Sequence, residues 1–121
     1  MLDFNKLQKM YPKAIKEFLH WNTRTYVNNE KLRYIFKKDK IVITDGSIEF
    51  RAEFCFRDLY DFFDLHKIII EVYKQHSVGK KDIVTKWSFD CNYLISTGYI
   101  NRTDAEISAF KSGFRMLNKR L

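Results

Sequence analysis

The stretch around which the chain is organised is Phe54-Cys-Phe-Arg-Asp-Leu-Tyr-Asp-Phe-Phe-Asp-Leu-His-Lys-Ile-Ile-Ile-Glu-Val-Tyr73. In its first part Leu59, Phe62 and Phe63 recur at intervals of three and four residues, so they share one face of a helix. The residues that follow are rich in β-branched side chains and no longer show the helical spacing, which predicts a short buried strand over residues 67–73. We therefore expect the other segments to pack around a central helix and strand.

Length and composition favour a single domain over residues 1–121. Hydrophobic residues make up 45% of the chain and aromatic residues 17%, including eleven Phe, while one Pro and four Gly leave little room for linkers. A chain of this size buries roughly two thirds of its unfolded surface without help from disulfides or metals. The composition therefore predicts one aromatic-rich core.

The lack of a recognisable targeting signal and the cysteine usage predict a cytoplasmic protein. The N-terminus lacks the apolar run of a signal peptide, and no stretch approaches the ~20 apolar residues of a membrane span, so no membrane association is expected. Cys55 and Cys91 are then most simply reduced thiols. A net charge of +7 favours encounter with polyanions without specifying a function.

The segments before the central unit are predicted to be two helices, an ambiguous stretch and a hairpin. Asp3 can cap a first helix, and Pro12 suits the first position of a second helix that ends near Trp21. Residues 22–38 fit either a helical turn or an edge strand. Asp45-Gly46 then favours a two-residue hairpin turn.

That turn also fixes the expected register of the hairpin. With a two-residue loop, Thr44 pairs with Ser47 and Ile43 pairs with Ile48. Alternating apolar residues on both strands then fall on one face, so the turn and the apolar pattern predict the same register.

The segments after the central unit are predicted to be a loop, a strand and a helix. The loop covers residues 76–82, and residues 86–96 alternate as one strand with Trp87, Phe89 and Cys91 on its buried face. Thr103 and Glu106 have the spacing of a capping box, which opens a helix that runs to the C-terminus.

The predicted element order is α-α-β-β-α-β-β-α, which indicates an α+β fold. Hairpins combined with helices form antiparallel sheets that helices cover on one side. We expect an antiparallel sheet of about four strands, with the N- and C-terminal helices packed on one face.

The ionisable residues point to no catalytic, cofactor-binding or metal site. Asp58 is expected to cap the central helix, with Asp61 in its first turn, where free N–H groups stabilise carboxylates. A metal-dependent nuclease would need an acidic residue and a lysine on one side of a strand, whereas Glu71 and Lys74 fall on opposite sides. An enzyme is therefore less expected than a binding protein.

Zinc binding and thiol catalysis are also disfavoured. Cys55, His66, His76 and Cys91 lack the short ligand spacings of structural zinc sites. Nothing in the sequence brings a cysteine beside a histidine that would lower the thiol pKa. We expect no cofactor.

Rows of basic residues suggest nucleic-acid binding as one function. Rows at helical spacing on neighbouring helices could merge into a surface for a phosphate backbone, or each could be the solvated side of an amphipathic helix. The candidate nucleic-acid-binding residues are Lys6, Lys9, Lys13, Lys16, Lys80, Lys81, Lys111, Arg115 and Lys119.

Exposed apolar residues suggest protein contacts as the other function. Val42, Ile69, Tyr73 and Leu94 fall on the expected outer face of the sheet. If uncovered, they would form a surface for a host protein or for a homodimer. A covering loop is the alternative.

Three segments resemble a group of known proteins: Tyr11-Pro-Lys-Ala14, Arg57-Asp-Leu-Tyr-Asp-Phe-Phe-Asp64 and the C-terminal residues 102–121. They are similar to small uncharacterised proteins encoded in phages and mobile elements of gut Bacteroidetes. The resemblance implies a bacterial cytoplasmic setting and a phage accessory role, acting on host nucleic acid or a host protein. It assigns a role to no residue. The leading expectation is a non-enzymatic interaction protein, with a basic nucleic-acid-binding domain as the alternative.

Overall fold

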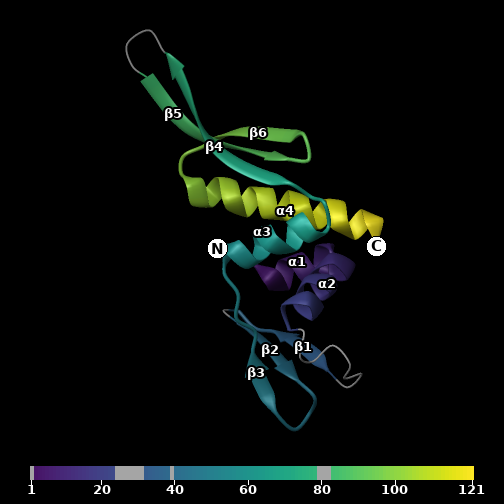
Figure 1. Ribbon diagram of the computed structural model, residues 1–121. Helices are drawn as coiled ribbons and strands as arrows, with labels where there is room; N and C mark the ends of the chain where they lie inside the picture. The colour runs from purple at the N-terminus through teal and green to yellow at the C-terminus, as the bar shows by residue number, and fades with distance from the viewer. Residues whose placement is uncertain (1, 24–31, 39, 79–82) are drawn as a thin grey trace.

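The computed structural model describes residues 2–23, 32–38, 40–78 and 83–121. The elements follow one another along the chain as shown in Figure 1. They are α1 (Phe4–Met10), α2 (Pro12–Asn22), β1 (Arg33–Phe36), β2 (Ile41–Thr44), β3 (Glu49–Arg51), α3 (Phe56–Leu65), β4 (Ile70–Val78), β5 (Ile83–Cys91), β6 (Leu94–Tyr99) and α4 (Arg102–Arg120).

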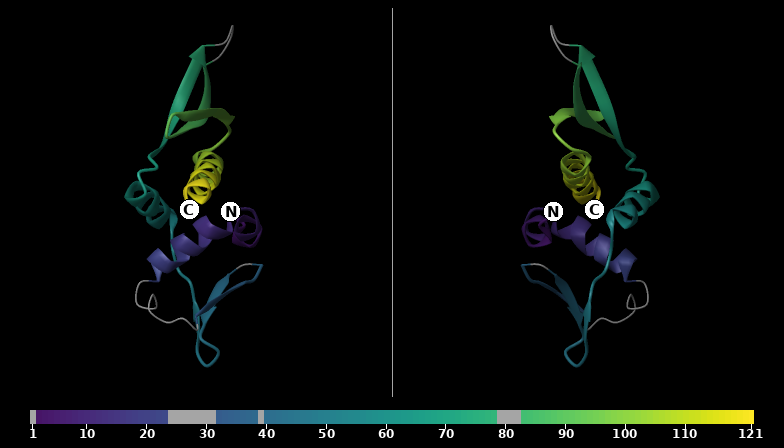
Figure 2. Two further views of the ribbon diagram at one scale, coloured as in Figure 1. Left: turned by 90° about the vertical axis from the view of Figure 1, so that its right-hand side faces the viewer. Right: turned by 90° about the vertical axis from the view of Figure 1, so that its left-hand side faces the viewer.

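The fold is α+β, with the helices in the middle and a three-stranded antiparallel sheet at each end (Figures 1 and 2). The strand orders are β1-β2-β3 and β4-β5-β6. The expectation of one sheet of about four strands is therefore wrong, because each hairpin gains a local third strand and α3 separates the two. The prediction that the terminal helices share one sheet face is also wrong. Helix α4 packs on β4 and β5, and α2 packs on α4.

The two N-terminal helices form as predicted. Asp3 caps α1, and its side chain accepts a hydrogen bond from the Lys6 backbone N–H at 3.1 Å. Pro12 is the first residue of α2, where its missing N–H has no cost. Phe18 and Leu19 face inward and are fully buried.

The aromatic core lies where α2, α3 and α4 meet. Phe62 and Phe63 of α3 are fully buried, as the periodicity predicts. The ring centroid of Phe63 lies 4.9 Å from that of Phe114, and the ring of Phe18 lies 5.1 Å from that of Phe62, both in edge-to-face contact. Such pairs add about 0.5–1.5 kcal/mol to the stabilisation that burial of the rings provides.

The strand after α3 begins later than predicted because a Schellman motif ends the helix. Lys67 adopts a left-handed conformation with φ of 58°. The N–H of Ile68 donates to the carbonyl of Phe63 at 2.9 Å, and the N–H of Lys67 donates to that of Asp64 at 3.0 Å. This motif redirects the chain, and β4 begins at Ile70.

Strand β4 then continues to Val78, so residues 76–78 are not part of a loop, as had been expected. The remainder of that predicted loop, residues 79–82, lies outside the described residues. Of the ambiguous residues 22–38, the described part contains edge strand β1, which pairs with β2.

The register of the β2–β3 hairpin differs from the prediction by two residues. Thr44 pairs with Glu49 rather than Ser47, and the loop contains four residues. Asp45 holds that loop, because its carboxylate accepts hydrogen bonds from the backbone N–H groups of Ser47 at 2.9 Å and Ile48 at 3.1 Å. These bonds lower the pKa of Asp45 to about 2. Because the shift is even, Ile43 and Phe50 still share one face, but Ile48 now lies in the loop and is 54% exposed.

The predicted strand over residues 86–96 is instead a hairpin, because Asn92 and Tyr93 form a tight turn. Both have positive φ, 48° and 72°. The Asn92 side chain accepts from the Ile69 N–H at 2.7 Å and donates to the Lys67 carbonyl at 3.1 Å. Contacts with a distant segment therefore stabilise a turn that the alternating pattern does not reveal.

Helix α4 begins one residue before Thr103, and the predicted capping box is wrong. Asn101 is the N-cap, and its side chain accepts from the Asp104 N–H at 2.8 Å. Glu106 is buried and accepts instead from the Tyr60 hydroxyl at 2.8 Å. Gly113 lies against the ring of Phe63, so the close approach that a mid-helix glycine suggests is with α3 rather than a sheet.

Candidate functional site

The aspartates of α3 have structural roles or face solvent. The helix begins at Phe56, so Asp58 is its third residue rather than its cap. The Asp58 carboxylate accepts from the Cys55 backbone N–H at 2.8 Å, which ties down the start of the helix. Asp61 lies outside the first turn, contrary to prediction, and both Asp61 and Asp64 are exposed.

The cysteines and histidines do not assemble. Within the described residues, no three His, Cys, Asp or Glu side chains are close enough to share a metal ion. Cys91 is buried beside the Met116 sulfur, and burial raises the pKa of its thiol to about 11. At neutral pH this thiol is therefore protonated and a poor nucleophile.

Every described member of the basic rows is exposed. Lys80 and Lys81 lie outside the described residues. The exposed members are Lys6 and Lys9 on α1, Lys13 and Lys16 on α2, and Lys111, Arg115 and Lys119 on α4.

The rows on α2 and α4 come together where the N-terminus of α2 meets the C-terminus of α4. The Asn118 side chain accepts from the backbone N–H groups of Lys13 at 3.0 Å and Ala14 at 3.1 Å. It caps a helix that has no side-chain cap of its own. The Lys13 ammonium also donates to the Leu121 carbonyl at 3.1 Å. Lys13 is thereby held beside the end of α4 that carries Lys119.

The four apolar residues expected on one outer face are divided between the two sheets. Val42 is only 5% exposed and lies in the sheet β1-β2-β3. Tyr73 is half-buried, whereas Ile69 and Leu94 remain half exposed. Val42 therefore contributes to no common surface with the other three.

Ile69 and Leu94 belong instead to a cluster around the β5–β6 turn, which we call the apolar turn and which also contains Tyr93 and Ile95. The carbonyl of Ile69 accepts from the N–H of Asn92 at 3.0 Å, which places Ile69 beside the turn. Tyr93 is 93% exposed and Ile95 58% exposed. The sequence did not reveal this cluster, because the turn was interpreted as strand.

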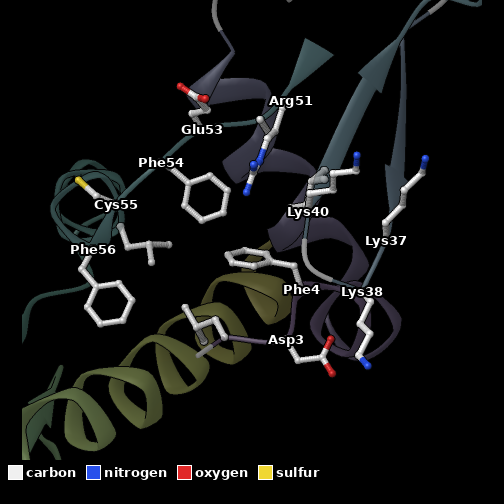
Figure 3. Close-up of a pocket in the computed structure, with 14 residues that line it drawn as sticks. Asp3, Phe4, Lys37, Lys38, Lys40, Arg51, Glu53, Phe54, Cys55 and Phe56 are labelled. Carbon is white, nitrogen blue, oxygen red and sulfur yellow. The ribbon is translucent and has the colours of Figure 1, made fainter. Parts of the chain in front are cut away.

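A pocket of about 640 Å³ lies on the other side of the helices from the apolar turn, between the helices and the sheet β1-β2-β3 (Figure 3). Phe4, Phe54 and Phe56 line its apolar part. Four cations also line it, which we call the basic rim: Lys37, Lys38, Lys40 and Arg51. The three lysines were visible in the sequence as a charged run, but the phenylalanines come from distant segments.

These features define a small basic α+β protein with one exposed apolar cluster, one partly merged basic surface and one basic-rimmed pocket. The chain matches no family model, no curated protein and no solved structure in the three comparisons. Across the described residues, none of the helices combines the length and the apolar character that a bilayer span requires.

Proposed function

We propose that this chain is a non-enzymatic interaction protein that contacts a protein partner through the apolar turn. An origin in phages or mobile elements stays a prediction, and no match to another protein tests it.

The conformation of Tyr93 carries the proposal. A bulky residue with φ of 72° is strained, at a cost of roughly 1–3 kcal/mol. Glycine would adopt that conformation without strain. The chain instead holds a large aromatic ring there with 93% of its surface in solvent. An exposed ring kept at such a cost is better explained by a contact than by folding, because tyrosines frequently anchor protein interfaces.

The edge position of β6 adds backbone groups to this surface. Among the described strands β6 pairs with β5 alone, so its other side is an edge of the sheet. The strand contains no charged residue and no proline, the features that usually protect an edge from pairing. A partner strand could therefore extend the sheet while its side chains cover the apolar turn.

The residues beside the apolar turn suggest the charge of the partner. Glu71 pairs directly with Asp90, which in turn pairs with Ile95, so two carboxylates stand beside Ile95, on the face opposite to Leu94. Like charges in direct opposition destabilise a sheet. A partner with lysine or arginine at the edge of its apolar surface would relieve that repulsion.

The test compares the wild type with Tyr93→Gly as baits for proteins from bacterial lysate treated with nuclease. We expect Tyr93→Gly to lose the partner while the free energy of unfolding stays constant or rises by up to about 1 kcal/mol, because the strain is relieved. Ile100→Ser is the matched control, since Ile100 is an apolar residue 86% exposed outside the apolar turn.

Sedimentation velocity over a range of concentrations shows whether the partner is a second copy. Self-association that Tyr93→Gly abolishes and Ile100→Ser preserves would identify a homodimer. Equal capture by all three proteins, without self-association, would contradict the proposal.

Binding to a nucleic-acid backbone is the second candidate, and the contact of Lys13 with the end of α4 favours it. That contact brings the Lys13 end of the α2 row beside the end of α4 that carries Lys119. We expect binding to labelled DNA that weakens steeply with salt, and we expect Lys16→Gln with Lys119→Gln to lower the salt slope by about one for each lost phosphate contact. Lys86→Gln on β5 is the control. Absence of binding at low salt would contradict this function.

A further inference from the structure

We infer that the pocket beneath the sheet β1-β2-β3 is a binding site for an organic anion with an aromatic body. Its apolar part is lined by the rings of Phe4, at the start of α1, and of Phe54 and Phe56, which flank the start of α3. At about 640 Å³ it has the size of sites that enclose small molecules. This site is independent of the apolar turn, which lies on the other side of the helices, near α4 (Figure 1).

Arg51 gives the pocket its selectivity for an anion. Its guanidinium extends toward the rings of Phe4 and Phe54, whereas Lys37 and Lys40 stand beside each other at the mouth (Figure 3). Within the described residues, no carboxylate forms an ion pair with Arg51. A guanidinium beside an apolar surface binds a planar carboxylate, sulfonate or phosphate through two parallel hydrogen bonds.

The two carboxylates at the pocket offset only part of the positive charge of the basic rim. The Asp3 carboxylate keeps its charge but is held as the cap of α1, where it accepts from the Lys6 backbone N–H. Glu53 directs its carboxylate away from the guanidinium of Arg51 in Figure 3. Four cations therefore face two carboxylates at this pocket. The excess positive charge attracts an anion and repels a cation of the same shape.

Fluorescence titration with two matched dyes tests the inference on the full chain. Anilinonaphthalene sulfonate carries an aromatic body and an anion, and phenyl naphthylamine has the same body without the charge. We expect the sulfonate to bind one site saturably and at least about tenfold more tightly than the neutral dye, since a charge-assisted bond to arginine is worth about one such factor.

Variants locate the site. We expect Arg51→Gln to weaken the sulfonate by about tenfold and to leave the neutral dye unchanged. Arg57→Gln removes the same charge from an exposed position on α3 outside the pocket and should change neither dye. Tyr93→Gly tests whether a dye binds at the apolar turn instead, and we expect it to change the affinity of neither dye. Thermal unfolding followed by circular dichroism confirms that each variant is folded.

Competition identifies the source of the natural anion. Adenosine monophosphate represents nucleotides and naphthoate represents aromatic carboxylates. Displacement of the dye by either one, weakened by Arg51→Gln, supports the inference and names the ligand class. Equal affinity for the two dyes, equal effects of the two arginine variants, or displacement by neither competitor would overturn it.

Discussion

Glu106 shows how one residue changes its role when the chain folds. Its spacing from Thr103 predicted a capping box. Instead its carboxylate lies 3.4 Å from Arg102 Nε and accepts a hydrogen bond from the Tyr60 hydroxyl. The residue is buried, so the hydroxyl of Tyr60 and the guanidinium of Arg102 stabilise its charge. Burial, together with Glu106, raises the pKa of Tyr60.

That raised pKa predicts a pH dependence of stability. Unfolded Tyr60 ionises near pH 10, while the folded chain keeps its proton to higher pH. The stabilisation is therefore complete below about pH 10 and is lost as the pH rises through the folded pKa. We expect urea unfolding at increasing pH to show a shrinking difference between the wild type and Tyr60→Phe. Tyr93→Phe is the control, and a constant difference would contradict the assignment.

At the scale of elements, the ends of the helices were harder to predict than their buried faces. The buried face of α3 follows from the spacing of Leu59, Phe62 and Phe63, and the structure confirms it. The ends depend on local competition, because Asn101 caps as well as Thr103. They also depend on distant partners: α2 receives its cap from Asn118, about a hundred residues away.

The start of α4 gives a prediction at this scale. Asn101→Ala removes the acceptor for the Asp104 N–H and should lower the free energy of unfolding by about 0.5–2 kcal/mol. Thr103→Ala should change it by less than about 0.5 kcal/mol, because Thr103 is exposed inside the helix. Chemical denaturation measures both. A larger loss for Thr103→Ala would restore the capping box that the sequence suggested.

At the scale of the whole molecule, the two sheets are attached differently to the helices. Strands β4, β5 and β6 contain nine, nine and six residues, and α4 packs along β4 and β5. Strands β1, β2 and β3 contain four, four and three residues. Among the described residues of the smaller sheet, Ile41 belongs to the shared buried core, and half-buried neighbours such as Tyr34 and Phe36 pack against that core. Val42 and Ile43 are buried outside that core.

Hydrogen exchange should reveal this difference. We expect hydrogen-bonded backbone amides of β2 to exchange at least about tenfold faster than those at the centre of β5, since regions with fewer buried contacts open more readily. Amides of α4 serve as the slow reference. Equal rates in both sheets would show that they open together, contrary to the prediction.

The sequence alone determined the α+β class, the starts of α1 and α2, and the buried phenylalanines of α3. Each follows from residues close in the chain, where the periodicity of apolar side chains and the geometry of proline act locally. Only the tertiary structure decided that two sheets form, because the turn at Asn92 depends on hydrogen bonds to the segment before β4. It likewise decided the pocket, since Phe4, Phe54 and Arg51 meet only when separate elements pack together.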